Sequence, residues 1–181
     1  MTQQEIIFAG FGGQGILSMG KFLAYAGMNR EMKVSWCPSY GPEMRGGTAN
    51  CSVILSEKEI GSPLVTRPDS IIVMNRPSFE KFESTLKPGG LMIMDSDLIP
   101  DAPTRDDIRV IRIPAQTIAA GIGSTTIANM VLLGALVKET GIVEVEELLT
   151  ALEEHGKAKF YNANVQAVTR GTEYAKVPVE A

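Results

Sequence analysis

Cysteine and histidine are scarce in this sequence of 181 residues. The two cysteines, Cys37 and Cys51, are too few for a disulfide framework or for the thiolate ligands of an iron–sulfur cluster. The single histidine, His155, has no cysteine or histidine neighbour at the spacing of a zinc site. We therefore expect both cysteines to be small buried hydrophobic residues, and we expect the chain to hold no metal.

Long apolar runs, a cationic leader and a surplus of positive charge are also missing. The net charge is −4, and no basic stripe with interleaved aromatic residues occurs. Because nucleic-acid phosphates reward clustered Lys and Arg, a general nucleic-acid binder is disfavoured. We expect no membrane segment and a cytoplasmic location. The hydrophobic content of 44% and the length fit one globular domain, residues 1–181.

The most informative stretch joins a short apolar run to a cluster of glycines and a second apolar run. Residues 6–9 predict a buried β-strand, and the spacing from Gln14 to about Arg30 predicts a helix. Glycines let the backbone turn sharply and approach a ligand, and the N–H groups at a helix start favour phosphate. A tight turn without a ligand is the simpler alternative, but the strand–turn–helix context favours a phosphate contact. The candidate contact residues are Gly10, Gly12, Gly13, Gln14 and Gly15.

The acid that a nicotinamide-dinucleotide site uses to bind ribose is missing. Residues 33–38 read as the second strand, which ends in Pro38 and Ser39. Glu31 comes before this strand, and Glu43 lies in the loop after it. The sequence therefore has the phosphate half of the dinucleotide fingerprint without the ribose half, and NAD becomes a minority alternative.

A second unusual stretch, residues 39–51, is broken by prolines and glycines into a loop of about ten residues. Loops of this length without regular structure are more often functional than not. One interpretation is a lip over a ligand or a docking surface for a partner. The alternative is a surface Ω-loop with a local Glu43–Arg45 pair. The side chains that carry chemistry on this stretch are Ser39, Tyr40, Glu43 and Arg45.

The rest of the chain alternates strand and helix patterns, which predicts an α/β fold with a mixed, mostly parallel sheet, flanking helices and a Rossmann-like start. We expect a short hairpin or edge excursion over residues 58–63. The helix over residues 126–137 is apolar nearly all round, so it must be covered, in part by another subunit. Asn129 is its polar exception and is expected to be a satisfied core amide.

Single residues elsewhere have simpler expected roles. We expect Met28 and Met32 to pack in the core and Lys21 to be a solvated charge. Asp95 and Asp97 follow a buried strand and fit turn capping better than metal binding.

The glycine stretch and the motif Ser39-Tyr40-Gly41-Pro42-Glu43-Met44-Arg45-Gly46-Gly47 together resemble the gamma subunit of the 2-oxoacid:ferredoxin oxidoreductases. The resemblance covers nearly the whole chain, and it is strongest for the 2-oxoglutarate and branched-chain 2-oxoacid enzymes. It implies a reversible reaction in which a 2-oxoacid, CoA and oxidised ferredoxin give acyl-CoA, carbon dioxide and reduced ferredoxin. The family's gamma domain is an α/β unit whose sheet can curl towards a barrel.

The resemblance also implies a division of labour. Thiamine diphosphate and iron–sulfur clusters belong to alpha, beta and ferredoxin-like delta partners, and ferredoxin accepts the electrons. The gamma subunit is implicated in handling CoA, so the glycine loop is expected to contact a CoA phosphate. Ser39, Tyr40, Glu43 and Arg45 are expected to face the CoA path or the alpha subunit. The chain would have no catalytic residue of its own and no activity alone.

Two rivals to this interpretation stay open. The chain could be a free-standing dinucleotide-binding oxidoreductase, which the missing ribose acid disfavours. It could also be a scaffold subunit whose glycine loop binds nothing and whose apolar helix docks a partner.

Overall fold

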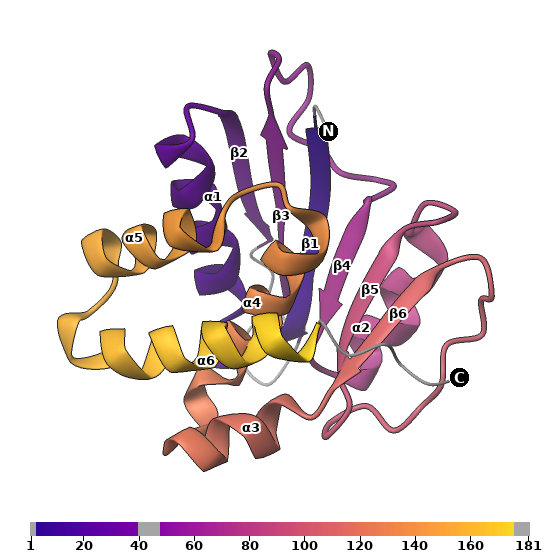
Figure 1. Ribbon diagram of the computed structural model, residues 1–181. Helices are drawn as coiled ribbons and strands as arrows, with labels where there is room; N and C mark the ends of the chain where they lie inside the picture. Colours follow the sequence, from indigo (N-terminus) through magenta and orange to yellow (C-terminus); the bar gives the residue numbers. More distant parts are fainter. Residues whose placement is uncertain (1–2, 40–47, 176–181) are drawn as a thin grey trace.

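The computed structural model describes residues 3–39 and 48–175 and shows an α/β chain built on one sheet (Figure 1). The strands are β1 (Gln3–Phe11), β2 (Lys33–Ser39), β3 (Thr48–Ser56), β4 (Ser70–Val73), β5 (Leu91–Asp95) and β6 (Arg109–Ile113). The helices are α1 (Ile16–Asn29), α2 (Arg76–Phe82), α3 (Ala115–Ile122), α4 (Ala128–Thr140), α5 (Val145–His155) and α6 (Tyr161–Tyr174). Short 3-10 turns form η2 (Glu83–Thr85), η3 (Thr125–Ile127) and η4 (Ala158–Phe160). Within the described ranges, none of the helices combines the length and the apolar character needed to cross a membrane.

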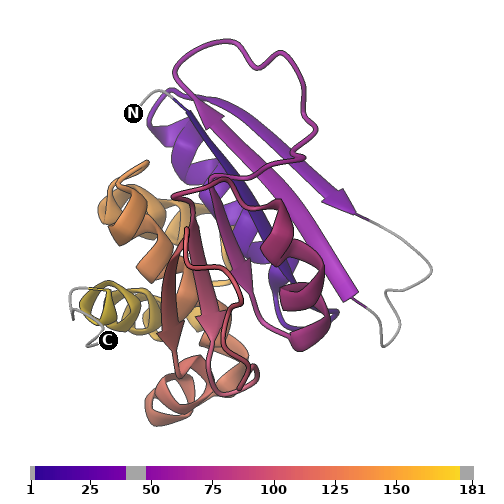
Figure 2. The ribbon, with the colours of Figure 1, turned by 90° about the vertical axis from the view of Figure 1, so that its right-hand side faces the viewer.

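The strand order in the sheet is β2-β3-β1-β4-β5-β6. Neighbouring strands from β1 to β6 along this order are parallel, whereas β3 runs antiparallel to both β1 and β2. The expectation of a mixed, mostly parallel sheet is therefore confirmed. The sheet ends at β2 and β6 and stays open, so the curling that the family resemblance implied does not close it into a barrel (Figures 1 and 2).

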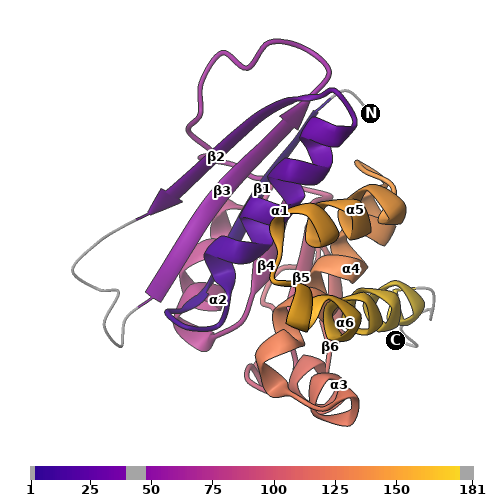
Figure 3. The same ribbon diagram turned by 90° about the vertical axis from the view of Figure 1, so that its left-hand side faces the viewer.

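Successive side chains of β1 point to opposite faces of the sheet, and each face has its own hydrophobic core. Ile6 and Phe8 point into the larger core, which α1 and α4 cover directly and α5 and α6 complete. Ile7 and Ala9 point to the opposite face, where Phe79 of α2 and the following turn cover them. Figure 3 shows α1, α4, α5 and α6 gathered on one side of the sheet. The molecule therefore places most of its helices, and the start of α1, on one face.

The middle and the end of α1 lie close to the sheet because glycines of α1 face the strands. A Cβ atom at Gly20 would lie 2.6 Å from the Sγ atom of Cys51 and 3.0 Å from Nε1 of Trp36. About two helical turns later, a Cβ at Gly27 would lie 2.5 Å from a methyl group of Leu55. These contacts fix the direction in which α1 leaves the glycine loop.

The α4 helix is the apolar helix that the sequence predicts. Every residue from 128 to 137 is buried within this single chain, because the sheet lies on one side of α4 and α6 on the other. The expectation that another subunit covers part of this helix is therefore wrong. Its close contact with α6 depends on Gly134 and Gly171, where a Cβ atom would collide with the facing backbone.

Three local expectations are also wrong. Residues 58–63 form no hairpin, since the segment between β3 and β4 is made of bends without strand partners. Met28 is 58% exposed on the last turn of α1. Cys37 is exposed because it lies on the uncovered face of the edge strand β2. Cys51 is buried as expected, and burial raises the pKa of its thiol to about 12.

Candidate functional site

The glycine loop connects β1 to α1 at the edge of the sheet where β1 and β4 end. Gly13 and Gly15 have positive φ values of 90° and 75°, which residues with a side chain rarely adopt. Gly15 is the N-cap of α1 in the left-handed conformation, and no side chain from the described residues caps this helix. Gly12 is exposed in the same turn. The first N–H groups of α1 and the positive end of its dipole can therefore meet an anion.

Gln14 holds this loop in shape. Its Oε1 atom accepts a hydrogen bond from the backbone N–H of Phe11 at 2.6 Å, and its Nε2 atom donates to the carbonyl of Met74 at 3.1 Å. Gly10 leaves the space for this amide, since a Cβ there would lie 2.5 Å from Gln14 Oε1. Both residues thus build the loop, and their direct contact with a ligand stays a prediction.

Asn129 ties the loop to α4 from the other side. Its Nδ2 atom donates to the carbonyl of Gly15 at 3.2 Å, and its Oδ1 atom accepts from the N–H of Met130 at 3.0 Å. The side chain is 6% exposed. The expected satisfied core amide is therefore confirmed, but its partner is the glycine loop, which the sequence did not predict.

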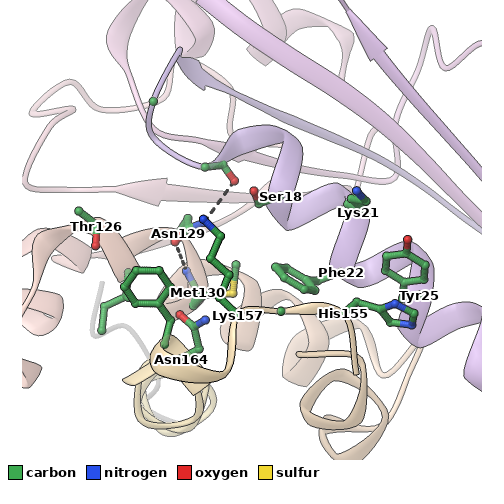
Figure 4. Close-up of a pocket in the computed structure, with 15 residues that line it drawn as sticks. Ser18, Lys21, Phe22, Tyr25, Thr126, Asn129, Met130, His155, Lys157 and Asn164 are labelled. Carbon is green, nitrogen blue, oxygen red and sulfur yellow. Dashed lines mark hydrogen bonds between the residues drawn. The ribbon is translucent and has the colours of Figure 1, made fainter. Parts of the chain in front are cut away.

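A cavity of about 490 Å³ opens beside the glycine loop (Figure 4). It lies between the exposed side of α1, the turn before α4, and the connection from α5 to α6. It is lined by Gly13, Gly15, Ser18, Lys21, Phe22, Tyr25, Thr126, Ile127, Asn129, Met130, His155, Gly156, Lys157, Phe160 and Asn164.

The charge around this cavity is positive, although the whole chain is acidic. Among the described residues no Asp or Glu lines the cavity, whereas Lys21 and Lys157 do. Neither lysine forms an ion pair with a described carboxylate. Lys21, expected to be a solvated charge, is exposed and also faces this space. Two uncompensated ammonium groups near a helix N-terminus favour an anionic ligand.

Aromatic side chains form part of the same wall. Phe22 and Phe160 line the cavity, and Phe160 is 44% exposed. At the end beside α5, the rings of Tyr25 and His155 stack with their centroids 3.6 Å apart and an angle of 6° between their planes (Figure 4). Aromatic faces beside cations suit a nucleotide, which combines a planar base with phosphates. Lys157, His155 and Phe160 carry no periodic sequence signal, and sequence reasoning missed them.

Of the second sequence motif, residues 39–47, the structure describes only Ser39. Ser39 ends β2, is exposed and pairs with Asn50 of β3, whereas Tyr40, Glu43 and Arg45 lie outside the described residues. The strand pairing places Thr48 opposite Phe11, at the start of the glycine loop. Ser39 and Thr48, the described residues on either side of residues 40–47, therefore lie at the same end of the sheet as the glycine loop. Ser39 does not line the cavity.

Polar residues that follow β4 and β5 have structural partners. Asn75 caps α2 through its side-chain oxygen. Asp97 accepts from the N–H of Thr117 at 2.7 Å and so caps α3, whose N-cap residue, Pro114, makes no side-chain cap bond. Asp95 is fully buried at the start of this turn, and burial raises the pKa of its carboxyl group. The expected capping role of the two aspartates is confirmed.

Relatives of known function align with nearly all of the chain. It is 37% identical over 180 residues to ketoisovalerate oxidoreductase subunit VorA of Methanothermobacter marburgensis, covering 97% of this chain and 37% of VorA. This chain therefore spans only 37% of that relative's length. It is 35% identical over 179 residues to 2-oxoglutarate synthase subunit KorC of Methanothermobacter thermautotrophicus, covering 95% of each chain.

Two solved structures have the same fold. The keto/oxoacid ferredoxin oxidoreductase gamma subunit from Geobacter sulfurreducens superposes with a TM-score of 0.84 at 31% identity, over 95% of this chain and 98% of that one. The 2-oxoglutarate:ferredoxin oxidoreductase from Magnetococcus marinus, with 2-oxoglutarate, coenzyme A and succinyl-CoA bound, superposes with a TM-score of 0.88 at 26% identity. That match covers 100% of this chain and 32% of the other.

The sequence also matches the pyruvate ferredoxin/flavodoxin oxidoreductase family over residues 5–174. This range runs from β1 through α6, so it includes the glycine loop and every element that lines the cavity. The chain therefore belongs to the pyruvate ferredoxin/flavodoxin oxidoreductase family.

Proposed function

We propose that this chain is the gamma subunit of a 2-oxoacid:ferredoxin oxidoreductase and that it positions CoA. The complex would convert a 2-oxoacid, CoA and oxidised ferredoxin to acyl-CoA, carbon dioxide and reduced ferredoxin. Alpha, beta and ferredoxin-like delta partners would carry thiamine diphosphate and the iron–sulfur clusters in the cytoplasm. The names of the relatives VorA and KorC support a branched-chain or 2-oxoglutarate substrate.

The thiols of this chain support placing the clusters on other subunits. Cys37 lies on the uncovered face of the β2–β3 pair, and Cys51 lies on the opposite face beneath α1. Two thiols on opposite faces of a sheet cannot ligate one cluster. This arrangement supports the proposal that the redox chemistry lies on partner chains.

The single observation that carries the proposal is the cavity beside the glycine loop. Its charged side chains are cationic, in a chain with a net charge of −4, and it opens at the N-terminus of α1. CoA carries a diphosphate, a 3′-phosphate and an adenine ring, which match phosphate-binding N–H groups, two lysines and aromatic walls. The bound CoA in the Magnetococcus structure is consistent with this choice of nucleotide.

The proposed role is positioning rather than bond making. The CoA thiol must reach an acyl group held on a partner subunit, and a bound, oriented nucleotide lowers the entropic cost of that encounter. Here Gly12, Gly13 and Gly15 would present backbone N–H groups to phosphate, while Lys21 and Lys157 neutralise its charge. The loop that begins at Ser39 and contains Tyr40, Glu43 and Arg45 would face the CoA path or the alpha subunit.

Gly13→Val in the assembled complex tests this role. A Cβ at Gly13 meets no atom within 4 Å, but its φ of +90° strains any residue with a side chain, so the variant changes the loop without a clash. We expect the KM for CoA to rise roughly tenfold or more, while 2-oxoacid decarboxylation with an artificial electron acceptor stays nearly unchanged.

Gly89→Val is the matched control. Gly89 also has a positive φ, of 75°, and open space around it, but it lies in the turn before β5, away from the glycine loop. The control should lose stability without changing the KM for CoA. Equal loss of CoA-dependent and CoA-independent activity in Gly13→Val, together with loss of partner subunits on gel filtration, would instead support the scaffold alternative.

The dinucleotide alternative is less well supported. In a Rossmann unit the second strand lies beside the first and ends in the acid that binds ribose. Here the antiparallel β3 separates β2 from β1, and β2 ends at Ser39 without an acid.

A further inference from the structure

We infer that Asn129 is a positioning residue that sets the direction of the first N–H group of α1, that of Ile16, where α1 leaves the glycine loop and a phosphate would bind. The inference rests on the proposed function, because it concerns the CoA contact made by that loop. Asn129 belongs to α4, and 114 residues separate it from Gly15. Its side chain joins the buried helix to the loop by a hydrogen bond.

The geometry of one peptide group carries the inference. The carbonyl of Gly15 accepts two hydrogen bonds, from the backbone N–H of Met19 at 3.0 Å and from Asn129 Nδ2 at 3.2 Å. The peptide unit is planar and trans, so its N–H, which belongs to Ile16, points opposite to this carbonyl. Ile16 is the first residue of α1, so its N–H has no carbonyl partner within the helix. Fixing the carbonyl therefore aims the Ile16 N–H towards the loop.

The Asn129 amide packs directly against the backbone of Gly15. A Cβ at Gly15 would collide with Nδ2 of Asn129, so only glycine allows the amide to approach. The φ of Gly15, +75°, is also one that side chains disfavour. Asn129 lines the cavity together with Gly13 and Gly15, yet it is 6% exposed and surrounded by an otherwise apolar helix.

Position 129 requires a side chain that both donates and accepts a hydrogen bond, as asparagine does. It donates to the Gly15 carbonyl and accepts from the N–H of Met130 at 3.0 Å with the two ends of one amide. An aspartate would keep the acceptor but lose the donor and would bury a charge beside an anion site. An apolar residue would leave the Gly15 carbonyl with only its helical partner. The amide thus does more than fill a hole in the core.

The test is Asn129→Ala in the assembled complex, measured alongside Gly13→Val. We expect the KM for CoA to rise roughly threefold to tenfold, as for loss of one hydrogen bond, with kcat at saturating CoA and CoA-independent decarboxylation nearly unchanged. Hydrogen–deuterium exchange without CoA should become faster in the peptide that contains Gly13 and Gly15.

Glu83→Ala is the matched control, because Glu83 is also buried and hydrogen-bonded but lies at the C-terminal end of α2, on the other face of the sheet. Its Oε1 atom accepts from the N–H groups of Thr104 at 2.6 Å and Arg105 at 3.2 Å. This variant should lower stability without changing the KM for CoA or exchange in the loop. If Asn129→Ala behaves like Glu83→Ala while Gly13→Val raises the KM, the inference is overturned and the proposed function stands. If Gly13→Val also leaves the KM unchanged, the proposed function fails as well.

Discussion

At the scale of single residues, two lysines that are two positions apart have different surroundings. Lys157 lines the cavity beside the glycine loop and has no described carboxylate partner. Lys159 does not line it, and its Nζ atom lies 4.8 Å from the centroid of the Phe160 ring. The same change of charge at these positions therefore separates a local effect on a ligand from the effect of net charge.

We predict that Lys157→Gln raises the KM for CoA about fivefold, since one partly exposed charge contact is worth about 1 kcal/mol. The effect should shrink as the salt concentration rises, because ions screen the lost attraction. Lys159→Gln is the control and should leave the KM unchanged. Steady-state kinetics of the complex at two salt concentrations measures both variants. Equal KM changes in the two variants would show that Lys157 makes no direct charge contact with CoA.

The residues of the site differ in how far the sequence predicted them. The glycines could be predicted because strand, turn and helix patterns meet within a few residues. Gln14 was expected to contact a ligand, but its amide is used within the fold, between Phe11 and Met74. Lys157 could not be found, because the packing of α5 and α6 on α1 and α4 brings it to the cavity, and such distant contacts leave no local pattern.

At the scale of helices and strands, α4 and α6 approach each other closely at a glycine, Gly171. A Cβ at Gly171 would collide with the carbonyl of Val131, which is backbone and cannot turn away as a side chain could. Gly121 in α3 offers a contrast, because nothing lies within 4 Å of its added Cβ and it is exposed.

We predict that Gly171→Ala destabilises the protein by about 1–2 kcal/mol, since overpacking outweighs the better helix propensity of alanine. The melting temperature should fall by roughly 2–8 °C for a chain of this size. Gly121→Ala should have the opposite sign and add up to about 1 kcal/mol. Denaturant unfolding with one optical probe measures both variants. A stabilised Gly171→Ala would mean that α4 and α6 can move apart at little cost.

The elements themselves were largely predictable from the sequence, because apolar spacing follows the faces that a strand or helix buries. The predicted helix over residues 126–137 lies largely within α4, Ala128–Thr140. The expected hairpin at 58–63 was wrong, since glycine and proline mark a break in the chain without showing whether strands lie beside it. The antiparallel placement of β3 could not be predicted either, because pairing is decided by contacts between distant strands.

At the scale of the whole molecule, the cavity is assembled from the beginning, middle and end of the chain. Its wall includes Gly13 from the first loop, Thr126 from the turn before α4 and Asn164 from α6. All of these residues are held by one core that runs between the sheet and its helices. A ligand that fills the cavity would therefore stabilise the folded chain as a unit rather than one loop.

We predict that CoA raises the melting temperature of the isolated chain and that NAD raises it much less. A ligand at a hundredfold excess over its Kd adds about 2.7 kcal/mol, which corresponds to a rise of roughly 5–10 °C for a chain of this size. Gly13→Val, measured from its own baseline, should lose most of the CoA shift, whereas Gly89→Val should keep it. A larger shift with NAD, or oxidation of a substrate by the chain alone with NAD, would contradict the gamma-subunit assignment. The absence of a shift with CoA would mean that binding requires the partner subunits or that the loop is only structural, and the kinetics of Gly13→Val in the complex separate these two outcomes.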